Sequence, residues 1–144
     1  MEIRKLNKDE FVQLLNEAPE SETEGIRNYL VKYKVNPYEY FENEAIESDA
    51  LLNGRPLYFG ALTFDVDDNR FLLWTITNTN IQAQKTLYKE SKKRAVAWAN
   101  KYGEIYAIMY KGIDKNIRWA QKMGFKIIEE KDNMIVLCLK GEQI

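Results

Sequence analysis

Two apolar runs on either side of one amphipathic segment constrain the fold of this chain more than any other feature. The runs are residues 71–77 (FLLWTIT) and 105–110 (IYAIMY), and both are apolar at nearly every position. Runs of this length, rich in β-branched and aromatic residues, are typical of strands that are buried on both faces of a sheet. The long crossover between them predicts that the two strands are parallel, with a right-handed connection.

The segment between the runs predicts a helix from about Ile81 to Tyr102. Asn78, Thr79 and Asn80 are each suited to cap its start, and Gly103 is suited to end it. Apolar residues recur along the segment at helical spacing, whereas its lysines fall largely on other positions. The apolar stripe comprises Leu87, Tyr88, Ala95, Trp98 and Tyr102.

The remaining elements follow from the same patterns. After the second run we expect a short helix from about Asp114 to Met123, a stop at Gly124, and a hairpin of residues 127–130 and 134–139. Before the first run we expect a strand at residues 3–6, two helices that precede Asn36-Pro37, and strands at 45–52 and 57–64. Residues 38–43 either pack their rings on the sheet or line a cleft. The expected order in this α/β (α+β) fold is β-α-α-β-β-β-α-β-α-β-β, in a single domain of residues 1–144.

Residues 115–125 (KNIRWAQKMGF) carry a family resemblance. They resemble the short helix and the lysine, aliphatic, glycine, phenylalanine ending of GNAT N-acetyltransferases, and the preceding strand, helix and strand occur in the GNAT order. Within that superfamily, residues 71–139 most resemble the internal virion protein A-like proteins of short-tailed bacteriophages. The resemblance implies a GNAT-like mixed central sheet of six to seven strands with a splayed parallel strand pair.

The resemblance also implies a site for acetyl-CoA. In the family, the pantetheine arm follows the backbone of the first strand of the parallel pair. The pyrophosphate lies at the start of the next helix, where free N–H groups and the helix dipole favour an anion. The residues implied to bind this cofactor are Thr75, Ile76, Thr77, Asn78, Thr79, Asn80, Ile81, Gln82, Lys85 and Asn116.

Three positions depart from the family pattern. Residues 78–85 contain no glycine, Ala120 stands where many acetyltransferases have a proton-donating tyrosine, and Ile113 stands where asparagine is common. The catalytic residues are therefore left open. The candidates for proton transfer are Glu104, Tyr106 and Tyr110, with a packing role as the alternative for the tyrosines, and Glu42, Glu44 and Glu47 as further candidate bases.

The absence of histidine narrows the chemistry further. It excludes Ser-His-Asp and Cys-His catalysis, and no acidic loop has calcium-binding spacing, so we expect no metal. The one cysteine, Cys138, lies in an apolar run and is expected to be a buried strand thiol. No apolar run approaches the length of a membrane span, and the first residues do not resemble a secretory signal, so the expected location is cytoplasmic.

The charges are distributed unevenly along the chain. Residues 1–69 carry 7 Lys and Arg against 15 Asp and Glu, whereas residues 70–144 carry 14 against 7. This division suggests docking, self-association or a phosphate-bearing ligand, although it also suits two separately solvated surfaces. The overall net charge of −1 disfavours nucleic acid as a partner.

Two functions fit these observations. The first is a phage-type protein in virion morphogenesis or host interaction, with phage or host proteins as partners and a degenerate acyl-CoA site. It is ranked first because of the phage resemblance and the three departures. The alternative is an acetyl-CoA-dependent N-acetyltransferase that acts on an unidentified amine.

Overall fold

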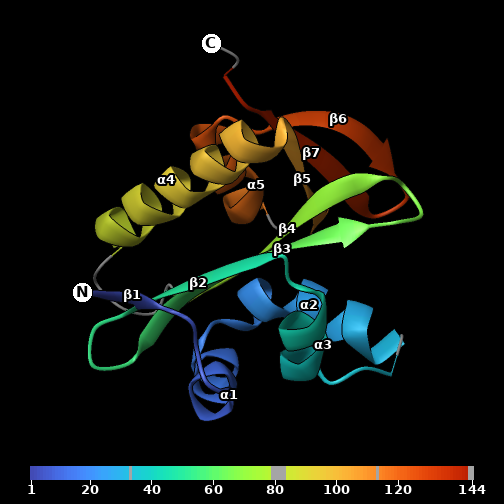
Figure 1. Cartoon of the computed structure of the whole chain (residues 1–144). Coiled ribbons are helices and arrows are strands. Elements are labelled where there is room, and N and C mark those ends of the chain that lie inside the picture. The colour runs from blue at the N-terminus through green and yellow to red at the C-terminus, as the bar shows by residue number, and fades with distance from the viewer. Residues whose placement is uncertain (33, 79–83, 113, 143–144) are drawn as a thin grey trace. The chain divides into compact units, whose positions relative to one another are not determined.

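The computed structural model describes residues 1–32, 34–78, 84–112 and 114–142, without the side chains of residues 29, 31 and 84. Figure 1 labels the helices and strands of these described residues. In chain order they are β1 (Glu2–Arg4), α1 (Lys8–Glu17), α2 (Glu20–Lys32), α3 (Pro37–Glu44), β2 (Glu47–Leu52), β3 (Pro56–Asp65), β4 (Arg70–Thr77), α4 (Gln84–Tyr102), β5 (Glu104–Tyr110), α5 (Asp114–Met123), β6 (Lys126–Lys131) and β7 (Met134–Lys140).

The strands form a mixed sheet in the order β1-β2-β3-β4-β5-β7-β6. The pairs β1–β2, β2–β3, β5–β7 and β6–β7 are antiparallel. In contrast, β4 and β5 are parallel, with Leu72 opposite Tyr106 as the register position described between them. This pairing confirms the parallel strands expected from the two apolar runs and the mixed α+β fold expected for the chain.

A third helix precedes β2, although the sequence predicted no helix between Asn36-Pro37 and the strand at residues 45–52. Asn36 caps α3, because its side chain accepts hydrogen bonds from the backbone N–H groups of Tyr38 and Glu39, and Pro37 occupies the first turn. The pair Asn36-Pro37 therefore begins a helix rather than only a turn. Helix α2 begins at Glu20, so Ser21 lies inside its first turn.

The chain divides into two compact units, and β4 contributes to both. Unit 1 comprises Met1–Thr63 and Trp74–Leu87, and unit 2 comprises Phe64–Leu73 and Tyr88–Ile144. The single domain of residues 1–144 remains a prediction.

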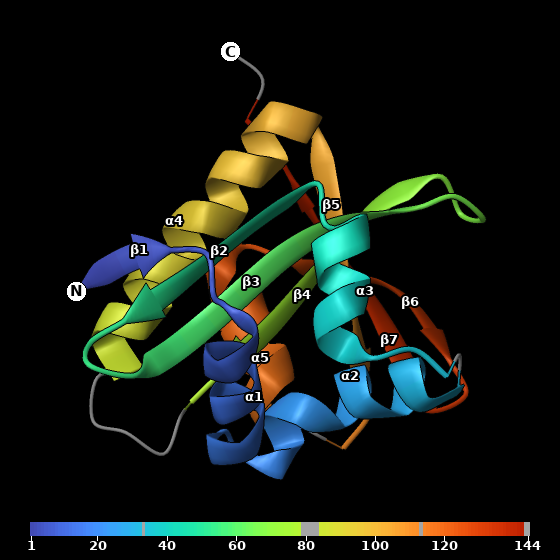
Figure 2. The same cartoon turned by 60° about the horizontal axis from the view of Figure 1, so that its bottom comes forward.

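The core of unit 1 lies between helices α1, α2 and α3 and one face of its strands (Figure 2). Phe11 of α1 is at its centre, with its ring 5.2 Å from that of Phe59 on β3 and 6.1 Å from that of Phe41 on α3. The helix that carries Phe11 is fixed by a capping box between Asn7 and Glu10. Phe41 is buried against Phe59, so this ring of residues 38–43 packs on the sheet.

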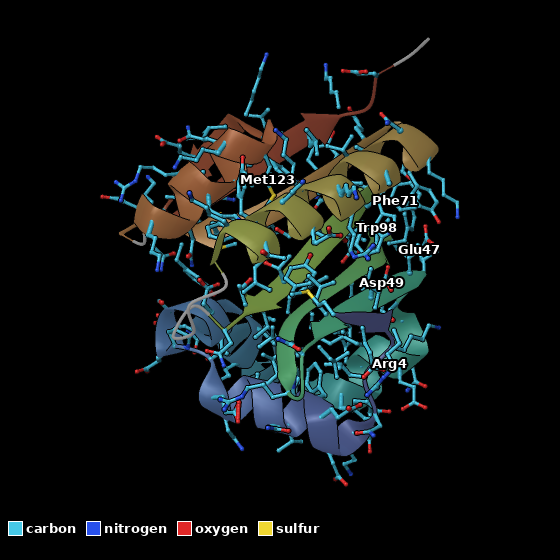
Figure 3. The ribbon with its side chains drawn as sticks, turned by 90° about the vertical axis from the view of Figure 1, so that its left-hand side faces the viewer. Arg4, Glu47, Asp49, Phe71, Trp98 and Met123 are labelled. Carbon is cyan, nitrogen blue, oxygen red and sulfur yellow. The ribbon has the colours of Figure 1, made fainter. Side chains whose placement is uncertain are left out.

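Unit 2 places α4 and α5 on strands β5 and β7. Its buried side chains include Trp98 of α4, Met123 of α5 and Leu137 of β7, and Figure 3 labels the first two together with Phe71. Gly103 ends α4 with a φ of 92°, and its N–H donates to the carbonyl of Ala99. This glycine stop was expected from the sequence.

Two features are absent from the part of the chain that the structure describes. None of the helices in that part is both long enough and sufficiently apolar to cross a membrane. Nor do three or more Asp, Glu or Cys side chains gather there in a way that would hold a metal ion.

Candidate functional site

Strand β5 brings two of the candidate proton-transfer residues into one polar cluster in unit 2. Successive residues of a strand point to opposite faces, so Glu104, Tyr106 and Tyr110 share a face of β5. Cys138 of β7 lies opposite Tyr106 on that face. The register therefore places a carboxylate, a phenol and a thiol side by side.

The carboxylate of Glu104 is the common acceptor in this cluster. The Tyr106 hydroxyl donates to Oε1 of Glu104 at 2.7 Å, and the Cys138 thiol lies 3.9 Å from Oε2. The thiol contact is long, even for sulfur, so the phenol is the main donor. Both Glu104 and Tyr106 are half-buried, which strengthens a hydrogen bond to a charged acceptor.

This arrangement keeps both donors protonated. The hydrogen bond to Glu104, followed by desolvation, raises the pKa of Tyr106 above the ordinary tyrosine range. Burial, followed by the charge of Glu104, raises the pKa of the Cys138 thiol. The thiol is 6% exposed and stays neutral, so the expectation of a buried strand thiol is confirmed.

The guanidinium group of Arg70 lies over the Tyr106 ring. Its guanidinium carbon lies 5.5 Å from the ring centroid, and the same group forms ion pairs with Asp65 at 3.5 Å and Asp68 at 3.3 Å. The exposed acidic turn between β3 and β4 is therefore tied to Arg70 through these two carboxylates. Arg70 was missed as a contributor because it precedes the first apolar run and has no motif of its own.

The other candidates for proton transfer occupy separate places. Tyr110 is half-buried near the end of β5, opposite Met134 of β7. Glu42 and Glu44 are exposed on α3 in unit 1, and Glu47 is half-buried at the start of β2. Glu104 is thus the candidate base that lies within the polar cluster of β5 and β7.

The candidate acyl-CoA residues on β4 belong to unit 1 and differ in accessibility. Thr75 is half-buried, whereas Ile76 and Thr77 are buried, and the Ile76 side chain is part of the unit 1 core. Asn78 is 2% exposed, and its N–H donates to the carbonyl of Leu57 at 2.9 Å. The Asn78 N–H is therefore committed to a backbone hydrogen bond. The candidates Thr79, Asn80, Ile81 and Gln82 lie outside the described residues.

The start of α4 is electrostatically suited to an anion. Lys85 is exposed in its first turn, and that turn holds no acidic residue. The first turns of α1, α2, α3 and α5 each contain at least one Asp or Glu. Acidic side chains neutralise the positive end of a helix dipole, so α4 retains more of that potential for an external anion.

Helix α5 packs against α4 within unit 2 through two aromatic residues. The Tyr88 hydroxyl donates to the carbonyl of Lys122 at 2.9 Å, and the Tyr88 ring lies 5.3 Å from that of Trp119. The Trp119 ring thus contacts α4. Ala120 is buried, so the position of the family tyrosine faces the core, while Asn116 is half-buried on the same helix.

A second polar contact fixes the middle of β4 in unit 1. The indole Nε1–H of Trp74 donates to Oγ1 of Thr63 at 2.8 Å, and the Trp74 ring lies 5.6 Å from Phe41 and 5.9 Å from Tyr40. The sequence shows Trp74 as one more apolar residue of its strand. The partner hydroxyl, which decides the orientation of the indole, could not be identified without the register of β3 and β4.

Comparison with known proteins identifies the fold. No protein-family profile matches the chain. A segment of 77 residues, 54% of the chain, is 32% identical to desmocollin-3 of Bos taurus, but it spans only 8% of that protein's length. So short a share of the protein carries no family assignment.

Solved structures match nearly the whole chain. PH1933 from Pyrococcus horikoshii OT3 covers 99% of this chain and 100% of its own, at 15% identity and a TM-score of 0.72. The match to the PaiA N-acetyltransferase of Thermoplasma acidophilum, in complex with coenzyme A, covers 96% of this chain and 98% of that protein, at 18% identity and a TM-score of 0.66. The match to the GNAT domain of PAT from S. lividans covers 96% of this chain and 89% of that domain, at 10% identity and a TM-score of 0.64. The mixed sheet with its parallel β4–β5 pair, together with these likenesses, shows that the chain has the fold of the GNAT N-acetyltransferases.

Proposed function

We propose that this chain is an acetyl-CoA-dependent N-acetyltransferase that acts on an amine. The observation that carries the proposal is the likeness of almost the full chain to N-acetyltransferases, one of them bound to coenzyme A. A fold does not by itself confer chemistry, so the residues of this chain must support the reaction as well. The role in virion morphogenesis or host interaction remains a prediction, and the solved neighbours favour the enzymatic alternative.

The first support comes from residues suited to acetyl-CoA. The exposed cation Lys85 and the acid-free first turn of α4 fit the pyrophosphate. Half-buried Thr75 on β4, in the same unit as Lys85, is the candidate for a contact with the pantetheine arm, whereas a role for Asn116 of unit 2 stays a prediction. When bound, acetyl-CoA supplies an activated acetyl group as a thioester.

The second support comes from the acid–base cluster of unit 2. In the proposed reaction the amine nitrogen forms a bond to the acetyl carbonyl carbon, the carbon–sulfur bond breaks, and the amine loses one proton. Glu104 is proposed to receive that proton, because its carboxylate is the acceptor of the cluster. Tyr106 orients that carboxylate with its hydroxyl, and it remains a neutral donor because its pKa is raised. Tyr110 lies at the far end of β5, roughly 20 Å from Glu104 at the rise of an extended strand, so it takes no part in this step and the departing thiolate takes a proton from water.

An acetyl-transfer assay tests this proposal. The protein is incubated with acetyl-CoA and a panel of primary amines, and release of the coenzyme A thiol is followed colorimetrically while mass spectrometry detects the acetylated amine. Glu104→Gln is expected to lower kcat by about 10²–10⁴-fold, the usual contribution of a general base. Glu24→Gln, on an exposed position of α2, is the matched control and should retain full activity. Undiminished transfer by Glu104→Gln would remove Glu104 from the mechanism, and no acetylated amine with any member of the panel would count against the function itself.

A further inference from the structure

Strand β6 is the last strand of the sheet order, and its outer edge pairs with no described strand (Figure 1). All six of its residues are exposed, including Ile127 at 40% and Ile128 at 54%. An open edge with exposed apolar side chains is a template for another strand, and proteins usually block such edges with charges or irregular backbone. The charges on β6 therefore decide whether its edge repels or accepts a partner.

A β-bulge rearranges the side chains of β6. Ile127 lies opposite Leu137 and Glu129 lies opposite Val136, so Ile128 is the extra residue. Lys126 lies opposite Cys138, which shares a face of β7 with Val136. Lys126 and Glu129 consequently lie on the same face of the sheet although they are three residues apart, and Ile127 lies on the other face.

This pattern makes the edge complementary to itself. In an antiparallel pair of two β6 strands about a twofold axis, Lys126 of each copy falls opposite Glu129 of the other, and Ile127 falls opposite Ile128. Opposite charges and apolar residues that face each other across strands both favour pairing. A shift to Lys126 opposite Lys131 would instead bring like charges together, so the first register is preferred.

We propose that the β6 edge is a homodimer interface, in which β6 pairs antiparallel with β6 of a second copy in this register. A contact made once by each copy with the same residues forms a closed twofold dimer and leaves no open edge there. The paired surface is small, so the dimer is weak and forms at high protein concentration. This proposal is independent of the proposed catalytic function.

Charge reversal tests the interface by sedimentation equilibrium from micromolar to millimolar protein. Lys126→Glu and Glu129→Lys should each weaken the dimer by roughly 2- to 30-fold, the loss expected for two exposed ion pairs. The double variant, which exchanges the two charges, should restore the dimer. The two single variants should also associate with each other when they are mixed.

Lys92→Glu, at an exposed position on α4, is the control with the same change in net charge as Lys126→Glu and should dimerise like the unaltered protein. All three substituted residues are exposed, so the substitutions leave the core intact. A protein that remains monomeric throughout the concentration range overturns the proposal. So does a dimer that the single reversals do not weaken, or one that the charge exchange fails to restore.

Discussion

Removal of the Tyr106 hydroxyl should reveal how strongly it is coupled to Glu104. The two groups are joined by a hydrogen bond of 2.7 Å, and both side chains are half-buried. Hydrogen bonds to charged groups contribute about 1.5–3 kcal/mol, and partial exposure lowers this range, so we expect a coupling of about 1–2 kcal/mol. Tyr106→Phe should therefore destabilise the protein, whereas the same substitution made in Glu104→Ala, which has no acceptor for the hydroxyl, should cost much less.

Urea unfolding of the four proteins in this double-mutant cycle measures the coupling directly. For a chain of this size, a loss of about 1–1.5 kcal/mol lowers Tm by about 2–6 °C. A coupling near zero would show that the contact contributes nothing to the free energy of unfolding, and it would refute the account of the cluster.

The ionisation of Tyr106 supplies an independent measurement. Its pKa is raised in the folded protein, so this contribution to stability is present below the unfolded tyrosine pKa of about 10 and is lost as the pH rises above that value. Phenolate absorbance, compared between the unaltered protein and Tyr106→Phe, isolates this one tyrosine. Ionisation of Tyr106 at an ordinary tyrosine pKa would contradict the proposed hydrogen bond.

Three further substitutions test other parts of the structure. The hydrogen bond from Arg4, followed by that from the Asn7 N–H, lowers the pKa of Glu10 to about 2, so the stability that ionised Glu10 contributes should be lost as the pH falls from about 4.5 to about 2. Glu10→Gln should therefore make the free energy of unfolding less dependent on pH in that range, and an unchanged pH dependence would argue against the contact. Gly141→Ala should destabilise the protein by about 1–3 kcal/mol in chemical unfolding, since its Cβ would clash with the Ala99 carbonyl oxygen, and a neutral effect would show that the backbone at residue 141 can move away. Trp74→Phe removes the donor to Thr63 and should cost at least about 1 kcal/mol in the same assay, whereas a stability equal to that of the unaltered protein would mean that the indole contact is dispensable.

The parts of the fold that could be predicted are those with strong local signals. The parallel pair follows from two fully apolar runs with a helix between them, because only strands buried on both faces have that composition. The stops at Gly103 and Gly124 follow from the freedom of glycine at positive φ, observed at 92° and 112°. Helix α3 was missed because its eight residues are aromatic and acidic without a clear stripe, and its stability comes from Asn36 and from the packing of Phe41.

The candidate site was predictable only in part, because its contacts join residues that are distant in sequence. Glu104 and Tyr106 were identified as candidates, but the sequence does not show that they bond to each other or that Cys138 lies beside them. The position of Arg70 over the Tyr106 ring likewise depends on the register of β4 and β5. No local pattern encodes strand register, so these contacts become visible only once the sheet is assembled.

Calorimetric titration with acetyl-CoA tests the proposed function most directly. We expect saturable binding of one acetyl-CoA per chain, weakened by Lys85→Glu, which places a negative charge in the first turn of α4, and unaffected by Lys92→Glu further along the same helix. Binding that is absent at millimolar acetyl-CoA would contradict the proposal that this chain is an acetyl-CoA-dependent enzyme.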